Sequence, residues 1–238
     1  MSVKAILQDI KDKDVKYVDL RFTDTKGRLQ HVTFDIDLVD DEFLEEGTMF
    51  DGSSIAGWKA INESDMLLKP DLDSAYIDPF YQHTTLFLFC DVLNPDTNEP
   101  YNRDSRSMAK KALAFVQSAG VGDKVFFGPE AEFFIFDDVR WSTQAHDTGY
   151  AYDSTELPAN TGSEYSEGNM GPRPGAKGGY FPVNPGDSGQ DLRAEMLSVM
   201  KDMGLNPEKH HHEVAPAQHE LGLKFAELVT MADRLQLY

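Results

Sequence analysis

The sequence has a single cysteine, few basic residues and no long apolar run. Because Cys90 stands alone, the chain has no intrachain disulfide and no cluster of thiolate metal ligands. The 22 basic residues are outnumbered by 41 acidic ones, and the net charge of −19 argues against nucleic acids and anionic membranes as partners. The longest strongly apolar run, residues 86–90, is far below the roughly 18 residues of a membrane span. The first residues are not typical of a signal peptide, so we expect a cytoplasmic protein.

The two common glycine-rich nucleotide motifs are also missing. Neither G-x-x-x-x-G-K-[ST] nor G-x-G-x-x-G occurs, so any nucleotide must be held by another device. Glycine and proline are nevertheless concentrated in residues 137–190, which contain 14 of the 30 in the chain. We expect this stretch to form a long functional loop.

The apolar periodicity predicts a mixture of helices and strands, which makes the fold α+β. The expected elements are a helix at residues 6–10, a hairpin of 18–22 with 32–36, a buried strand at 86–93, a helix at 106–118, a strand at 125–136, and helices at 192–203 and 228–235. We place a domain boundary near residue 103, giving domains of residues 1–103 and 104–238.

Two neighbouring glutamates form the first candidate site. Glu130 and Glu132 are two residues apart in a predicted strand, so their side chains share one face at roughly 6.5–7 Å. Their mutual repulsion of roughly 2–3 kcal/mol, at an effective dielectric of about 20, becomes attraction when a divalent cation binds between them. For this pair alone, an exposed strand edge screened by water and salt is the alternative interpretation.

Acids and imidazoles crowd together in a second cluster at residues 208–225. Glu213 and Glu220 would share a face of one helix, but Pro216 in its interior would cost about 3 kcal/mol. A hairpin is therefore favoured, and it would bring both glutamates toward the earlier pair. Four converging glutamates suit Mg²⁺ or Mn²⁺ better than zinc or copper.

The three consecutive histidines at residues 210–212 could suggest a transition-metal site instead. Successive residues of a strand point to opposite faces, however, so three adjacent imidazoles cannot all ligate one ion without a bulge. For each histidine, packing or hydrogen bonding to a ligand is the commoner role.

Five motifs, in this order, resemble those of bacterial type I glutamine synthetases. They are FDGSSIAGW at residues 50–58, NRD at 102–104, GPEAEFF at 128–134, KGGYFP at 177–182 and HHHEVA at 210–215. The resemblance covers essentially the whole chain, which is similar to the first half of a family member. It implies a small β-grasp-like N-terminal domain, followed by the first part of a catalytic domain built on an antiparallel sheet.

The resemblance also implies an ATP-dependent ligase. The γ-carboxylate of L-glutamate attacks the terminal phosphate of ATP, and ammonia then displaces phosphate from γ-glutamyl phosphate to give glutamine, ADP and phosphate. Glu132, Glu213 and Glu220 resemble ligands of the metal on the glutamate side. Glu130 resembles a ligand of the metal on the ATP phosphates, so two Mg²⁺ or Mn²⁺ sites are expected.

An ammonium pocket follows from the same resemblance. Asp51 resembles the group that binds ammonium and takes its proton, with Ser54, Tyr180 and Glu213 completing the pocket. Glu208 resembles an ATP-site residue. The resemblance further implies a homo-oligomer of two stacked six-membered rings, with the Asp51 loop at a subunit boundary. Without the resemblance, Asp51 would be interpreted as a turn aspartate that caps its own loop, and Tyr180 as a packing aromatic.

Three other functions compete with this interpretation. One is a γ-glutamyl ligase for a larger amine such as a polyamine, against which the acidic Asp51 argues. Another is a scaffold or regulator of the same fold, for which loss of the carboxylates would be expected. The last is a simple divalent-cation binding protein, which would not need the Asp51 loop. Because family members are roughly twice as long, we expect the chain by itself to be inactive.

Overall fold

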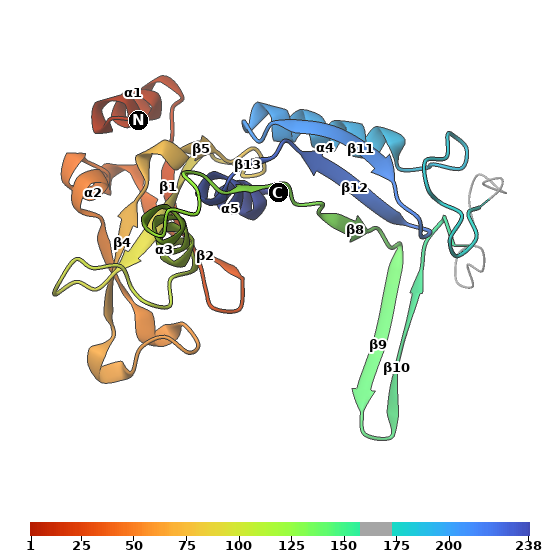
Figure 1. Ribbon diagram of the computed structural model, residues 1–238, viewed down its shortest axis with the longest axis horizontal. Helices are drawn as coiled ribbons and strands as arrows, with labels where there is room; N and C mark the ends of the chain where they lie inside the picture. The colour runs from red at the N-terminus through yellow and green to blue at the C-terminus, as the bar shows by residue number, and fades with distance from the viewer. Residues whose placement is uncertain (158–172) are drawn as a thin grey trace. The chain divides into compact units, whose positions relative to one another are not determined.

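The computed structural model describes residues 1–157 and 173–238. Here the chain forms two compact units, one of Met1–Phe127 with Phe225–Tyr238 and the other of Gly128–Lys224. Figure 1 shows the helices and strands of both, coloured along the chain. Among the helices of the described residues, none is both long and apolar enough to cross a membrane. The domain boundary predicted near residue 103 does not coincide with the division between these two compact units, and it stays a prediction.

The first unit is built on a six-stranded sheet in the order β2-β1-β6-β4-β3, with β5 paired to β6. β1 and β6 run parallel, and the other pairs are antiparallel. The strands are β1 (Tyr17–Thr23), β2 (Leu29–Asp35), β3 (Thr48–Asp51), β4 (Asp65–Pro70), β5 (Tyr76–Ile77) and β6 (Thr85–Leu93). The helices are α1 (Val3–Asp12), α2 (Asp41–Glu46), α3 (Ser105–Ser118) and α5 (Leu228–Leu237), and the short strands β7 (Phe126–Phe127) and β13 (Ala226–Glu227) pair with each other.

The hydrophobic core of this unit contains Val18, Leu20 and Phe22 of β1 and Leu86, Leu88 and Cys90 of β6, which share one face of the sheet. Leu20 and Leu88 pair across the two strands, and Ile6 of α1 packs into the same cluster. The predicted helix at 6–10, hairpin, buried strand at 86–93 and helix at 106–118 are confirmed within α1, β1–β2, β6 and α3.

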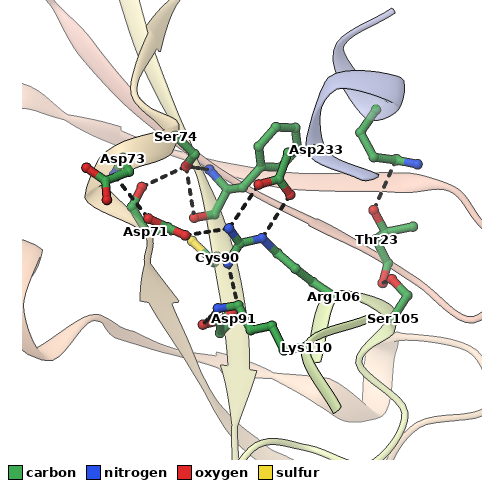
Figure 2. Close-up of polar contacts among 12 residues, drawn as sticks. Thr23, Asp71, Asp73, Ser74, Cys90, Asp91, Ser105, Arg106, Lys110 and Asp233 are labelled. Carbon is green, nitrogen blue, oxygen red and sulfur yellow. Dashed lines mark hydrogen bonds and ion pairs between the residues drawn. The ribbon is translucent and has the colours of Figure 1, made fainter. Parts of the chain in front are cut away.

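A half-buried guanidinium connects four segments of the first unit, as Figure 2 shows. Arg106 of α3 donates from Nε and Nη2 to both carboxylate oxygens of Asp233 in α5, at 2.9 and 3.0 Å. It also donates to Asp91 of β6 at 2.6 Å and to Asp71 before the short turn that leads to β5. Three acidic side chains therefore share one cation, and the ion pairs attach α5 to the sheet.

A three-stranded antiparallel sheet in the order β11-β12-β8 forms the centre of the second unit. Its strands are β8 (Glu132–Phe134), β11 (Pro207–His212) and β12 (Gln218–Leu223), with helix α4 (Gln190–Asp202) against β11, and a separate ribbon of β9 (Asp138–Gln144) and β10 (Asp147–Asp153). The predicted hairpin around Pro216 and the predicted helices at 192–203 and 228–235 are confirmed.

Two predictions about this part of the chain are wrong. The expected strand at 125–136 is two short strands, β7 and β8, because Gly128 and Pro129 lie between them and proline cannot donate to a strand ladder. The expected long loop at 137–190 begins instead with the β9–β10 ribbon. Only Gly149 of its 14 glycines and prolines precedes residue 158, so the composition of the whole stretch concealed two regular strands. Residues 158–172 lie outside the described part of the chain.

Candidate metal site

Three side chains form a row across the sheet of the second unit. His211 of β11 pairs with Glu220 of β12, and Glu220 pairs with Glu132 of β8. Directly opposite residues on adjacent strands project from the same face, with Cβ atoms about 4.5–5.5 Å apart. Strand pairing alone therefore places two predicted metal ligands and one imidazole on one face of the sheet.

His211 lies between two carboxylates. Its Nδ1 is 3.3 Å from Oε1 of Glu213, which directly follows the end of β11, and its Nε2 is 3.4 Å from Oε2 of Glu220. The ligand atoms of these three residues all lie within 4.8 Å of one another. The Val214 amide also donates to Glu213 Oε2 at 3.0 Å, which orients that carboxylate. One imidazole nitrogen and two carboxylate oxygens are thus close enough to share one cation.

Glu220 is a buried acid whose charge is incompletely compensated. Only 4 % of the residue is exposed, and no hydrogen-bond donor among the described residues reaches its buried Oε1. The nearest positive group, Lys209 Nζ, is 3.8 Å away, beyond hydrogen-bonding distance. Burial raises the pKa of Glu220, and the negative charges of Glu130 and Glu213 raise it further against the opposing effects of His211 and Lys209. A divalent cation would satisfy this oxygen and turn the repulsion into attraction, so the donor set fits Mg²⁺ or Mn²⁺.

The other two predicted ligands are more exposed. Glu132 accepts a hydrogen bond from Gln218 Nε2, which lies at the start of β12. Glu130 lies in the loop before β8 and is close enough to act on the charge of Glu220. Neither belongs to the tight group of His211, Glu213 and Glu220, and their metal roles stay predictions.

The pattern of alternation in β11 sorts the three histidines. His211 shares its face with Glu213, whereas His210 and His212 make their hydrogen bonds in two buried networks. The three imidazoles therefore point to two faces of the strand, as its alternation predicts. His211 is not among the predicted site residues, although its two-residue spacing from Glu213 is the signal that could have identified it.

A buried ion pair joins His212 to Glu156. His212 Nε2 is 2.6 Å from Glu156 Oε2, and its Nδ1 is 2.7 Å from the carbonyl oxygen of Glu213. Because both ring nitrogens face acceptors, the ring carries both protons. Burial lowers the pKa of His212, but these two hydrogen bonds outweigh it and the pKa is raised. Burial raises the pKa of Glu156, but hydrogen bonds from His212, Ser188 and the Ala217 amide outweigh it and hold this pKa at about 2.

The second network surrounds Arg193, which is fully buried in α4. Its guanidinium donates to both oxygens of Asp187, at 2.9 and 2.5 Å, and to Nδ1 of His219 at 2.8 Å. Since arginine can only donate, His219 accepts at Nδ1. Burial is the largest cause that lowers the pKa of His219, to about 4, so its ring is neutral. No sequence signal identifies Arg193, Asp187 or Glu156 as buried, because charged residues are exposed in most proteins.

Tyr180 lies beside His211 of the candidate metal site. The Gly179 amide donates to the Val214 carbonyl at 2.9 Å, and the Tyr180 ring meets the His211 ring edge to face, with centroids 5.7 Å apart. A Cβ atom at Gly179 would lie 2.7 Å from the Glu213 carbonyl oxygen, so only glycine fits. The structure therefore brings Tyr180 next to His211, which in turn contacts Glu213.

The remaining predicted residues lie elsewhere. Asp51 is exposed at the end of β3 and accepts hydrogen bonds from the Ser53 amide, the Ser53 hydroxyl and the Ser54 hydroxyl, at 2.9, 2.6 and 3.1 Å. The bonds from Ser53 lower the pKa of Asp51. Asp51 and Ser54 belong to the first unit, whereas Tyr180 and Glu213 belong to the second. Glu208 is exposed at a bulge of β11, and the roles predicted for all five stay predictions.

Two family models match the chain. The model described as "Glutamine synthetase, beta-Grasp domain" matches residues 14–95, and the one described as "Glutamine synthetase, catalytic domain" matches residues 102–238. Together they cover most of the chain and include every predicted site residue.

Curated relatives match over the whole chain. A glutamine synthetase of Azorhizobium caulinodans is 64 % identical over 237 residues, which are 100 % of this chain and 50 % of the relative. One of Rhizobium meliloti is 58 % identical over 98 % of this chain and 50 % of its own length. The chain thus spans about half the length of these relatives.

Solved structures agree with the fold. A cryo-EM structure of Plasmodium falciparum glutamine synthetase superposes with a TM-score of 0.87 at 29 % identity, covering 100 % of this chain and 47 % of that one. A GmaS complex with ADP superposes with a TM-score of 0.71 over 97 % of this chain and 46 % of that one, and its 23 % identity supports similarity of fold alone.

Proposed function

The chain belongs to the glutamine synthetase family, and from this premise we propose that it takes part in joining ammonia to the γ-carboxylate of L-glutamate with ATP. The observation that carries the proposal is the buried Oε1 of Glu220, which no donor among the described residues reaches and which has Glu213, His211 and Glu130 nearby. Such a site needs a cation, and phosphoryl transfer from ATP is a reaction that needs divalent cations.

The glutamates would divide between two Mg²⁺ or Mn²⁺ sites. Glu132, Glu213 and Glu220 would hold the ion beside the substrate carboxylate, and Glu130 would hold the ion beside the ATP phosphates. Bound there, the ions supply positive charge where negative charge spreads over the phosphoryl oxygens. The chain's own net charge of −19 makes such bridges necessary, because it would otherwise repel ATP and glutamate.

The ammonium pocket is proposed to contain Asp51, Ser54, Tyr180 and Glu213. The Ser53 hydrogen bonds lower the pKa of Asp51, so its carboxylate is ionised at neutral pH and can attract ammonium and accept its proton. The Ser54 hydroxyl already orients this carboxylate. Ammonia formed in this way would attack the γ-glutamyl phosphate.

The wider setting of the reaction is also a proposal. Glu208 is assigned to the ATP site, in a homo-oligomer of two six-membered rings whose neighbouring subunits contribute the Asp51 loop. The proposed compartment is the cytoplasm, which supplies ATP and keeps a lone thiol such as Cys90 reduced.

The test is an assay of the full-length protein that contains this chain, with glutamate, ATP, Mg²⁺ and either ammonia or a panel of larger amines. We expect ammonia to be preferred, because Asp51 offers a small anionic site rather than a pocket for a long diamine. Preference for a polyamine would favour a γ-glutamyl ligase of different substrate, and no turnover with any amine would favour a scaffold or regulator.

A substitution connects the assay to the site. Glu213→Gln should remove most of the turnover, because it neutralises a carboxylate of the tight group while keeping its size. Glu195→Gln is the matched control, since Glu195 is an exposed glutamate of α4 in the same unit. Near-normal turnover of Glu213→Gln would contradict the proposed metal geometry.

A further inference from the structure

A single buried carboxylate joins three segments of the second unit. Glu156, 5 % exposed, follows the β9–β10 ribbon. Its Oε1 accepts from the Ser188 hydroxyl at 2.7 Å, and its Oε2 contacts His212 Nε2 at 2.6 Å and accepts from the Ala217 amide at 2.8 Å. All of these donors lie far from Glu156 in the sequence, so the carboxylate acts as a tertiary link between the β11–β12 hairpin and the segment before α4.

One of these bonds fixes the turn of the hairpin. Ala217 has a φ of +62°, in the left-handed region that side chains rarely adopt. The Ala217 amide that points at Glu156 compensates for this conformation, and the Ala217 side chain is 1 % exposed. The turn is completed by the Glu213 amide, which donates to the Gln218 carbonyl at 2.8 Å.

The bond between Glu156 and His212 reaches the candidate metal ligand Glu213 through the backbone. His212, held by Glu156, places its Nδ1 2.7 Å from the carbonyl oxygen of Glu213. The peptide of Glu213 is thereby restrained from two sides, because its amide is bonded to Gln218. Glu156 thus controls both ends of the turn that separates Glu213 from Glu220.

We propose that Glu156 is a positioning residue, which sets the spacing of Glu213 and Glu220 for a divalent cation without touching the ion. The inference rests on the proposed metal site and names a residue outside its ligand set. Groups that orient metal ligands from behind typically change metal affinity or activity by 10–100-fold when they are replaced.

The experiment measures Mn²⁺ binding to the full-length protein by titration followed with electron paramagnetic resonance. Glu156→Gln is compared with wild type and with Glu195→Gln, the exposed control on α4. We expect Glu156→Gln to raise the Mn²⁺ dissociation constant by about 10–100-fold. Excess Mn²⁺ should restore much of its turnover, because the ligands themselves are intact. Glu195→Gln should bind as wild type does.

A second variant covers the case in which Glu156→Gln does not fold. His212→Asn removes the link to Glu156 while leaving the Glu156 charge, its Ser188 bond and its Ala217 bond. We expect it to weaken Mn²⁺ binding to a similar extent. If both single variants fold, the double variant should bind no more weakly than the worse single one, since both changes break the same link.

The outcomes separate this inference from the proposed function. Mn²⁺ affinity within twofold of wild type in a folded Glu156→Gln or His212→Asn variant overturns the role of Glu156 and leaves the metal site standing. If Glu213→Gln binds Mn²⁺ as tightly as the wild-type protein does, the proposed metal site itself is overturned. Weakening that excess Mn²⁺ does not relieve at all would also overturn the positioning role, because it indicates loss of the fold instead.

Discussion

Gly179 provides a sensitive test of how closely Tyr180 and the β11–β12 hairpin must approach each other. In Gly179→Ala the new Cβ would lie 2.7 Å from the Glu213 carbonyl oxygen, 2.8 Å from His212 Cε1 and 3.0 Å from His212 Nδ1. Ordinary contact begins at 3.4 Å, so the segments must separate by about 0.7 Å, the difference between 3.4 and 2.7. Neither neighbour can yield cheaply, since one is backbone and the other is a ring bonded at both nitrogens.

The cost can be estimated from the same contacts. Overpacking of this kind costs roughly 1–3 kcal/mol, and stretching the 2.9 Å bond from the Gly179 amide to Val214 costs about 1 kcal/mol more. We therefore expect Gly179→Ala to lower the free energy of unfolding by about 2–4 kcal/mol. It should also raise the KM for ammonia, because Tyr180 moves away from the hairpin that carries Glu213, and both residues belong to the proposed ammonium pocket.

The assay pairs denaturant unfolding with steady-state kinetics of the full-length protein. The matched control is Gly175→Ala, since no atom of residues 1–157 or 173–238 beyond its chain neighbours lies within 4 Å of a Cβ at that position and the backbone imposes no left-handed φ. Equal unfolding free energies and equal KM values for ammonia in Gly179→Ala and Gly175→Ala would show that the close approach at Gly179 is unimportant.

Two further predictions concern the first unit. Arg106→Met leaves three carboxylates facing one another, so it should lower the free energy of unfolding of the first unit by about 3–5 kcal/mol. Urea titration followed by the fluorescence of the buried Trp58 measures this loss. A loss below about 1 kcal/mol would contradict the expectation. Burial raises the pKa of Asp24, but hydrogen bonds from the Arg28 amide, the Gln30 amide group and the Lys26 amide outweigh it and lower the pKa below its usual 3.8. The ionised Asp24 therefore stabilises the fold above pH 3.8, and this stabilisation is lost as the pH falls below 3.8 toward the folded pKa. The stability deficit of Asp24→Asn should accordingly shrink in acid, and a deficit that is constant from pH 6 to pH 3 would be inconsistent with this assignment.

Local rules were sufficient where one residue decided between two structures. Pro216 excluded a helix and predicted the β11–β12 hairpin, which the structure contains. The two-residue period of a strand then predicted that the histidines at 210–212 point to different faces, and His211 does separate from His210 and His212.

Prediction failed where the deciding interaction is tertiary. Glu156, Asp187 and Arg193 are buried only because charged partners from distant segments meet them, and no local pattern marks such pairs. The strand expected at 125–136 failed for a local reason instead, since the alternation of its apolar residues concealed the interruption at Pro129.

Glu220 and its neighbours are proposed to bind a divalent cation, and crystals of the full-length protein grown with Mn²⁺ would reveal such an ion. Anomalous scattering at the manganese edge locates the ion without reference to activity. We expect an anomalous peak within roughly 2.5 Å of a Glu220 carboxylate oxygen and of a Glu213 carboxylate oxygen. Anomalous density that is absent there at saturating Mn²⁺, or that is found only away from both glutamates, would contradict the proposal.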